Sequence, residues 1–135
     1  MDEGVVFHLI DKEKRDFLEL AIYAAKANGI MEEAEKITIE AYCKEMELDQ
    51  YSLDGLNSLD NVLDSLSKSS LENKKIVLME IIGMCFCDGT IDLSEEAFSR
   101  KVAQKLEIDE KLYDTFIKDI GEYTTILRLI NSHIF

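Results

Sequence analysis

Three carboxylates that could bind a cation lie close together around a glycine: Asp88, Asp92 and Glu95. The segment reads Asp88-Gly-Thr-Ile-Asp-Leu-Ser-Glu95 and matches the second half of a calcium-binding EF-hand loop, with aspartate, glycine, an apolar residue and the final glutamate in register. Carboxylate oxygens are the ligands that hard cations prefer. The spacing is therefore compatible with a site for a divalent cation such as calcium.

The first half of an EF-hand loop is not present. Met84 and Phe86 occupy the positions of the first two oxygen ligands, so a complete EF-hand is excluded on ligand chemistry. What remains is a weaker site in which Asp88, Asp92 and Glu95 bind the ion while water and backbone carbonyls complete its shell. The alternative is helix capping, in which the same carboxylates stabilise the free amides of a helix N-terminus without any ion.

The same segment occurs earlier in the chain as Asn28-Gly-Ile-Met-Glu-Glu-Ala-Glu35, at a constant offset of 60 residues. Asn28 replaces the leading aspartate, so a site made by Asn28 and Glu35 should bind a cation more weakly. The pairing extends beyond the turns, and a duplicated helix-turn-helix unit of about 40 residues is the simplest explanation. Identical residues at this offset are Leu18/Leu78, Ile22/Ile82, Gly29/Gly89, Glu35/Glu95, Glu47/Glu107, Asp49/Asp109 and Asp54/Asp114.

The elements that position these turns are predicted to be helices. Proline is absent and glycine occurs only 6 times, which favours an all-α bundle. Capping residues and apolar residues at helical spacing predict seven helices. The expected ranges are 11–28 capped by Asp11, 32–47, 59–66 capped by Ser58, a helix to 87 that starts at a Ser69–Glu72 capping box, 92–106, 109–120 and 124–131.

The helix that contains residues 76–87 is apolar almost all round, so we expect it at the centre of the bundle. Glu80 is the exception in this run. Because a buried unpaired carboxylate is costly, Glu80 should either face solvent or have a partner. We expect it to face solvent on a narrow polar stripe.

The length of 135 residues suits one domain, 1–135. The formal net charge of −13 produces a negative electrostatic potential, which repels nucleic-acid phosphates and anionic lipids and attracts metal cations and basic protein surfaces. No signal peptide or membrane-spanning run is evident, and the three cysteines have no disulfide spacing. We therefore expect a soluble cytoplasmic protein, monomeric by default, that binds neither nucleic acid nor membranes.

Catalytic motifs are not evident. His8 and His133 lie in terminal segments without a Ser-His-Asp or Cys-His context, and no glycine-rich phosphate loop occurs. Two non-enzymatic functions remain. The first is a protein-interaction module whose acidic surface, including Glu32, Glu33, Glu95 and Glu96, binds a basic or amphipathic partner. The alternative is a module that binds a divalent cation through the carboxylates of the repeated turn.

The two apolar helices that end in (Asn/Asp)-Gly-x-(Met/Ile)-x-x-x-Glu, followed by Glu-Leu-Asp and Glu-Ile-Asp helix ends, resemble the tellurite-resistance TerB family. That family includes the similar N-terminal module of a membrane-anchored DnaJ-like co-chaperone. The resemblance covers about 17–56 and 76–116. It implies a compact bundle of about seven helices with a cytoplasmic role in stress response, metal-ion handling or protein assembly. It also implies cation-binding positions at Asp88 and Glu95, and at Asn28 and Glu35.

Overall fold

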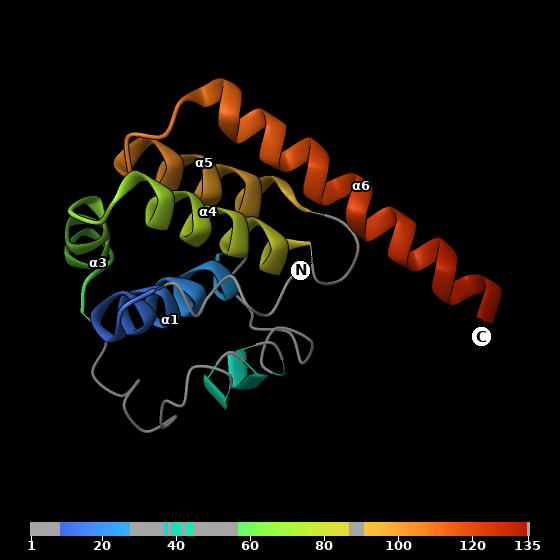
Figure 1. Cartoon of the computed structure of the whole chain (residues 1–135), viewed down its shortest axis with the longest axis horizontal. Coiled ribbons are helices and arrows are strands. Elements are labelled where there is room, and N and C mark those ends of the chain that lie inside the picture. The colour runs from blue at the N-terminus through green and yellow to red at the C-terminus, as the bar shows by residue number, and fades with distance from the viewer. Residues whose placement is uncertain are drawn as a thin grey trace.

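The computed structural model describes residues 9–27, 37, 39–41, 43–44, 57–86 and 91–134. Within these ranges the chain is helical and contains no strand, which confirms the all-α prediction. Helical residues occur between 37 and 44, in addition to the five helices that have defined bounds (Figure 1). These five are α1 (Asp11–Ala25), α3 (Leu59–Ser67), α4 (Leu71–Cys85), α5 (Leu93–Lys105) and α6 (Glu110–Ile134).

Helix α4 lies at the centre of the fold, as its apolar composition predicts. It contacts α1 on one side and both α5 and α6 on the other, while α3 packs against α1 and α5 (Figure 1). Its side chains on several faces are fully buried, among them Val77, Leu78, Ile81 and Ile82. Helices α1, α5 and α6 therefore remove most of α4 from water, which is the arrangement that a largely apolar helix requires.

Two of the predicted N-caps are confirmed. Ser58 caps α3, because its Oγ accepts a hydrogen bond of 3.2 Å from the N–H of Asn61. Asp92 caps α5, and its Oδ1 accepts a hydrogen bond of 2.7 Å from the N–H of Glu95. Both caps satisfy an amide that a helix N-terminus otherwise leaves without an acceptor.

Two other helix starts differ from the prediction by one residue. Ile10, not Asp11, is the N-cap of α1, because the Glu13 side chain reaches back to accept the Ile10 N–H at 3.0 Å. Ser70, not Ser69, caps α4 and accepts the N–H of Asn73 at 3.1 Å. Neighbouring residues compete for a helix start, and only the backbone geometry selects one of them.

The predicted break near Gly121 does not exist. Residues 109–120 and 124–131 were expected to form two helices, but α6 is continuous from Glu110 to Ile134. A single glycine costs a helix only ~1 kcal/mol, and no proline follows it. The Thr124 and Thr125 hydroxyls also donate to the Gly121 carbonyl, at 3.0 and 2.9 Å, which keeps them within the helical turn. This part of the chain therefore forms one helix where two were predicted.

Helices α1 and α4 follow the 60-residue offset of the sequence. Each has 15 residues, and the bounds of one helix are displaced from those of the other by 60 positions. Matched positions are also buried alike, including Leu18 with Leu78 and Ile22 with Ile82. The two sequence segments thus form the same element with the same inward face.

The C-terminal part of α6 projects beyond the helices on which its first half packs (Figure 1). We call residues 123–134 the α6 arm. None of the described helices, including this long one, is both long and apolar enough to cross a membrane.

Candidate functional site

Of the five predicted cation ligands, the structure describes Asp92 and Glu95. Asp88, Asn28 and Glu35 lie outside the described residues. Asp92 Oδ1 accepts hydrogen bonds from the Glu95 N–H and the Ser94 hydroxyl, both at 2.7 Å. Glu95 Oε1 in turn accepts the Asp92 N–H at 3.4 Å, which completes a capping box.

Among the described residues, this geometry is that of a capping box. Glu95 is only 7% exposed, and its carboxylate faces the helix start. No group of three or more His, Cys, Asp or Glu side chains in the described ranges is placed to hold a metal ion. The cation hypothesis therefore depends on Asp88, which the described structure does not include.

A row of buried carboxylates on α1 was not predicted. Glu13, Asp16 and Glu19 are 6%, 8% and 0% exposed, and their spacing of three residues places them on one face of the helix. The spacing of three residues is visible in the sequence and could have indicated a shared face, but acidic residues at helical spacing usually face solvent. Here α3 and α4 cover them.

Each of these carboxylates has a polar partner across a helix contact. Asn73 Nδ2 donates to Glu13 Oε1 at 2.9 Å, and the Ser65 hydroxyl donates to Asp16 Oδ2 at 2.6 Å. Asn57 donates to Glu19 through its backbone N–H at 3.3 Å and through its side chain at 3.2 Å. The row therefore holds α3 and the start of α4 on α1, since buried polar groups persist only when they are hydrogen-bonded.

Two carboxylates of this row have altered pKa values in opposite directions. Burial raises the pKa of Asp16, and the nearby charges of Glu19 and Glu13 add to the rise, although Ser65 and Lys12 oppose it. Burial also acts to raise the pKa of Glu13, but hydrogen bonds from Ser69, the Ile10 amide and Asn73, with the charge of Lys12, outweigh it and lower the pKa. Neighbouring groups thus decide the direction of the pKa shift within one row.

The expectation that Glu80 faces solvent is wrong. Glu80 is 3% exposed, because α4 is enclosed by α1, α5 and α6 and has no solvent-facing stripe at this position. The equivalent residue on α1, Leu20, is fully buried as well. Glu80 is not without an interaction partner, which agrees with the other alternative for a buried carboxylate.

A polar cluster joins α5 to α6. Ser99 and Tyr113 are 0% and 1% exposed, and their hydroxyl oxygens lie 2.7 Å apart. The Arg100 guanidinium lies 4.7 Å from the centroid of the Tyr113 ring and pairs with Glu110 at 2.9 Å and with Glu96 at 3.4 Å. Burial raises the pKa of Tyr113, so this phenol stays protonated and serves packing.

The two described residues of the expected acidic docking surface, Glu95 and Glu96, both interact with other groups of the chain. Glu95 is buried in the capping box, and Glu96 pairs with Arg100. Glu32 and Glu33, the other members of that surface, lie outside the described residues.

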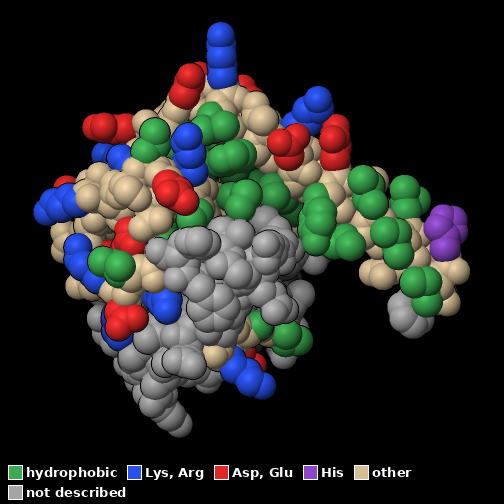
Figure 2. Space-filling model, in the orientation of Figure 1, with side chains coloured by type: hydrophobic (Ala, Val, Ile, Leu, Met, Phe, Trp, Pro, Cys, Tyr) green, Lys and Arg blue, Asp and Glu red, His purple; other side chains and the backbone are tan. Residues whose placement is uncertain are grey.

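Most of the exposed large apolar side chains in the described part of the chain are on the α6 arm. Hydrophobic side chains gather along its projecting length in Figure 2. Leu127 is 41% exposed, and Ile134 reaches 67%. The sequence prediction treated this segment as a helix that closes the bundle, so its exposure was missed. Large apolar side chains of the arm that are exposed are Tyr123, Ile126, Leu127, Leu129, Ile130 and Ile134.

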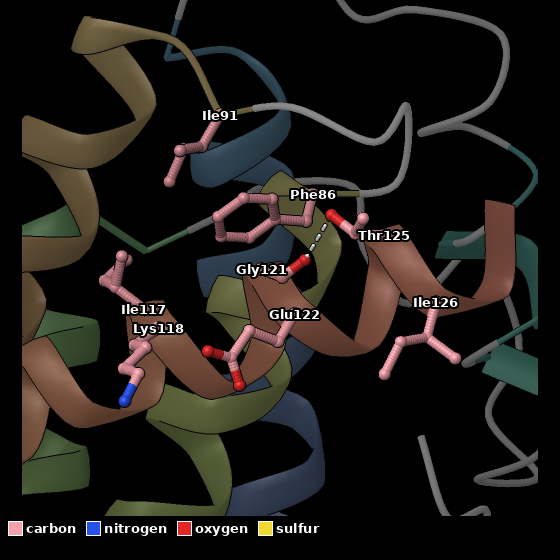
Figure 3. Close-up of a pocket in the computed structure, with 8 residues that line it drawn as sticks. All are labelled: Phe86, Ile91, Ile117, Lys118, Gly121, Glu122, Thr125 and Ile126. Carbon is pink, nitrogen blue, oxygen red and sulfur yellow. Dashed lines mark hydrogen bonds between the residues drawn. The ribbon is translucent and has the colours of Figure 1, made fainter. Parts of the chain in front are cut away.

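Two apolar grooves adjoin α6. One, of about 630 Å³, lies at the base of the arm, where the Phe86 ring lies between Ile91 and Gly121 (Figure 3). A Cβ at position 121 would be in ordinary contact with the ring, at 3.6 Å. The second groove, of about 430 Å³, lies between α4 and α6 and is lined by Leu71, Glu72, Lys75, Ile76, Met79 and Phe116.

The chain matches no protein-family model, no curated protein and no solved structure. The resemblance to the TerB family therefore stays a prediction from sequence, and function has to be inferred from the geometry of the described residues.

Proposed function

We propose that this chain is a non-enzymatic helical module that binds protein through the α6 arm. The observation that carries this proposal is the exposure of the arm: six large apolar side chains within 12 residues are each 41–67% exposed. Contiguous apolar surface of this kind marks interaction sites in soluble domains. Helices with such a face bind by laying it against an apolar groove or another helix.

The charge of the arm indicates the chemistry of its partner. Residues 123–134 contain no Asp or Glu, although the whole chain carries a formal charge of −13. Arg128 and His133 are the basic residues of the arm. Because the arm has no carboxylate, a basic partner surface would form few favourable charge interactions with it. The complementary partner surface is therefore apolar. Burying one such side chain completely contributes ~1.5–3 kcal/mol, and the half-exposed side chains of the arm contribute a part of that each.

The polar clusters of the described residues have a structural role. The buried carboxylates of α1 are bonded to Asn73, Ser65 and Asn57, and the hydroxyls of Ser99 and Tyr113 are bonded to each other. Among the described residues these groups join helices, and none of the bonds pairs a nucleophile with a histidine base. The cation-binding alternative depends on Asp88 and stays a prediction.

We further infer that α1 with residues 37–44, and α4 with α5, are two copies of one helix-turn-helix unit. Support comes from helix bounds that differ by 60 residues and from matched burial in the second helices. Ile39 and Cys43 are 6% and 2% exposed, and their equivalents Ser99 and Ala103 are 0% and 2% exposed. The TerB resemblance then suggests a stress- or metal-related response as the setting of this module.

Crosslinking in cells tests the proposed function. A photo-reactive amino acid replaces Leu127, on the arm, and in a matched control it replaces Lys101, an exposed residue of α5. We expect discrete crosslinked protein products from position 127 that are not obtained from position 101. Equal products from both positions, or none from position 127, would contradict the assignment of the arm as the docking element.

A further inference from the structure

Helix α3 is fixed to α1 by hydrogen bonds whose acceptors are mostly side-chain carboxylates. The Ser65 hydroxyl, in the middle of α3, donates to Asp16 Oδ2 at 2.6 Å. Asn57, two residues before α3, donates to Glu19 through its side chain at 3.2 Å and its backbone N–H at 3.3 Å. The Tyr23 hydroxyl in turn donates to the Asn57 carbonyl at 2.7 Å. The polar part of the contact between α1 and α3 therefore depends mainly on two carboxylates.

These two carboxylates lie where negative charge is unfavourable. Asp16 and Glu19 are 8% and 0% exposed, and they lie about one helical turn apart on the same face of α1. Burial disfavours the charged form of a carboxyl group, and a second carboxylate nearby disfavours it further. The groups that α3 presents to them are hydroxyl and amide donors, which carry no positive charge. The contact is therefore sensitive to the protonation of a carboxyl group.

The charge state of Asp16 depends mainly on its burial and on charged groups of α1 itself. Burial is the largest effect and raises the pKa of Asp16, although the hydrogen bond from α3 opposes it. Lys12 favours the ionised carboxylate, whereas Glu19 and Glu13 disfavour it. Glu80, the buried carboxylate of α4, is also acidic and cannot neutralise this row. The fold thus favours a proton on Asp16.

The cations of the helices that pack on α1 contact other groups. Lys68, the C-cap of α3, pairs with Asp64 at 3.8 Å, and both side chains are exposed. The Lys74 ammonium of α4 donates to a backbone carbonyl at 3.4 Å. Lys105 of α5 lines a small hollow together with the carboxylates of α3, Asp60 and Asp64. Among the described contacts, none brings a cation of α3, α4 or α5 onto the buried row of α1.

We propose that the contact between α3 and α1 is a pH-sensitive switch: a proton on Asp16 tightens the contact, and loss of that proton as pH rises loosens it. The protonated carboxyl group still has an oxygen that accepts the Ser65 hydroxyl, and it no longer repels Glu19. The ionised form keeps the hydrogen bond but holds a desolvated charge beside a second carboxylate. The switch lies in a different part of the fold from the α6 arm, so it goes beyond the proposed function.

Loosening of α3 would uncover apolar surface. Val62, Leu63 and Leu66 are the buried side chains of α3, at 1%, 2% and 0% exposure. The helix has only 9 residues, and it packs on α1 and α5 at the edge of the fold, whereas α4 lies at the centre. Elements with fewer buried contacts open locally at a lower free energy than central helices do. A rise in pH therefore shifts the chain toward a form in which these three side chains are accessible.

The pH dependence of this opening has a definite sign and an upper limit. A carboxyl group that binds its proton more tightly in the closed form changes the opening equilibrium by up to about tenfold per pH unit between its two pKa values. This window begins at the ordinary aspartate pKa of about 3.9 and ends at the raised pKa of Asp16 in the closed form. Opening should increase with pH through the window and become independent of this group above it.

Hydrogen exchange of the full chain between about pH 4 and pH 7 tests the switch. Protection factors, which remove the direct effect of pH on exchange chemistry, should fall with rising pH for the amides of α3 and fall less for those of α4. Asp16→Asn should abolish the difference, because the amide oxygen still accepts the Ser65 hydroxyl and the group does not titrate. Asp64→Asn is the matched control: this carboxylate of α3 is exposed, so the difference should persist.

A direct titration of Asp16 provides a test that needs no variant. The side-chain carboxyl carbon, followed by nuclear magnetic resonance in the wild-type chain, should titrate above the ordinary aspartate pKa of about 3.9. A titration at or below that value would overturn the switch. So would protection of α3 that rises with pH relative to α4, or a difference that persists in Asp16→Asn. An equal fall in α3 and α4 would show global loss of stability and would overturn the local opening.

Discussion

Asn73 Nδ2 donates a hydrogen bond of 2.9 Å to Glu13 Oε1, and these two residues are equivalent positions of the sequence offset. Each is the third residue of its helix, Glu13 in α1 and Asn73 in α4. The bond therefore joins matched positions at the N-terminal ends of the two helices.

Removal of this bond should destabilise the fold. Asn73→Ala leaves Glu13 buried with one donor fewer, so we expect the free energy of unfolding to fall by ~1–3 kcal/mol. Urea denaturation of wild type, Asn73→Ala, Glu13→Gln and the double variant measures the coupling between the two side chains. Strict additivity of the two single changes would contradict a direct interaction.

The ionised form of Asp16 should reduce stability at neutral pH. The pKa of Asp16 is raised in the folded state, so the folded protein binds this proton more tightly than the unfolded chain does. The free energy of unfolding therefore falls as pH rises from the ordinary aspartate pKa of about 3.9 through the raised pKa of the folded state. Asp16→Asn keeps an acceptor for the Ser65 hydroxyl and removes the charge. We expect this variant to gain stability relative to wild type at pH 7 and to lose the gain near pH 4, as measured by urea denaturation. A larger gain at pH 4 than at pH 7 would contradict this sign.

Substitutions at Asp92 separate capping from cation binding. Asparagine caps helices as well as aspartate does but is a poorer ligand for hard cations, so Asp92→Asn should keep wild-type stability. Asp92→Ala should lose ~1 kcal/mol. We expect the melting temperature of wild type to be equal in chelator and in calcium. A rise in calcium that Asp92→Asn or Glu95→Gln abolishes would instead support the cation site, since a ligand at 100 times its dissociation constant stabilises by ~2.7 kcal/mol.

Gly121→Ala should stabilise the protein. Gly121 lies inside a continuous helix, and a Cβ there would make ordinary contacts of 3.6 and 3.7 Å with the Phe86 ring. Replacement of glycine by alanine at such a position contributes up to ~1 kcal/mol. Thermal and urea denaturation measure the change. A loss of stability would indicate that the chain needs the conformational freedom of glycine at this position.

Local sequence patterns predicted the all-helical class, the central position of α4 and the caps at Ser58 and Asp92. These features depend on composition and on contacts within a few residues, which a sequence shows directly. Burial of Glu80 and of the α1 carboxylates depends on which helices come to lie over them. Acidic residues are usually exposed, so only tertiary packing could reveal Glu13, Asp16 and Glu19 as buried.

The α6 arm was missed for a similar reason. Its apolar spacing is the same whether a helix packs on its own body or projects from it, so periodicity alone assigned it to the bundle. The expected break near Gly121 also concealed the continuity of α6 from Glu110 to Ile134. Only the arrangement of α6 relative to α4 and α5 shows that the second half of this helix extends beyond its supports (Figure 1).

Hydrogen exchange of the purified chain tests most directly whether the α6 arm is an uncovered docking helix. Amides of residues 123–134 should exchange faster than those of α4 in dilute protein, because the arm lacks the packing that protects a central helix. Arm amides as protected as those of α4 would contradict the account, because the apolar face of the arm would then already be covered within the monomer.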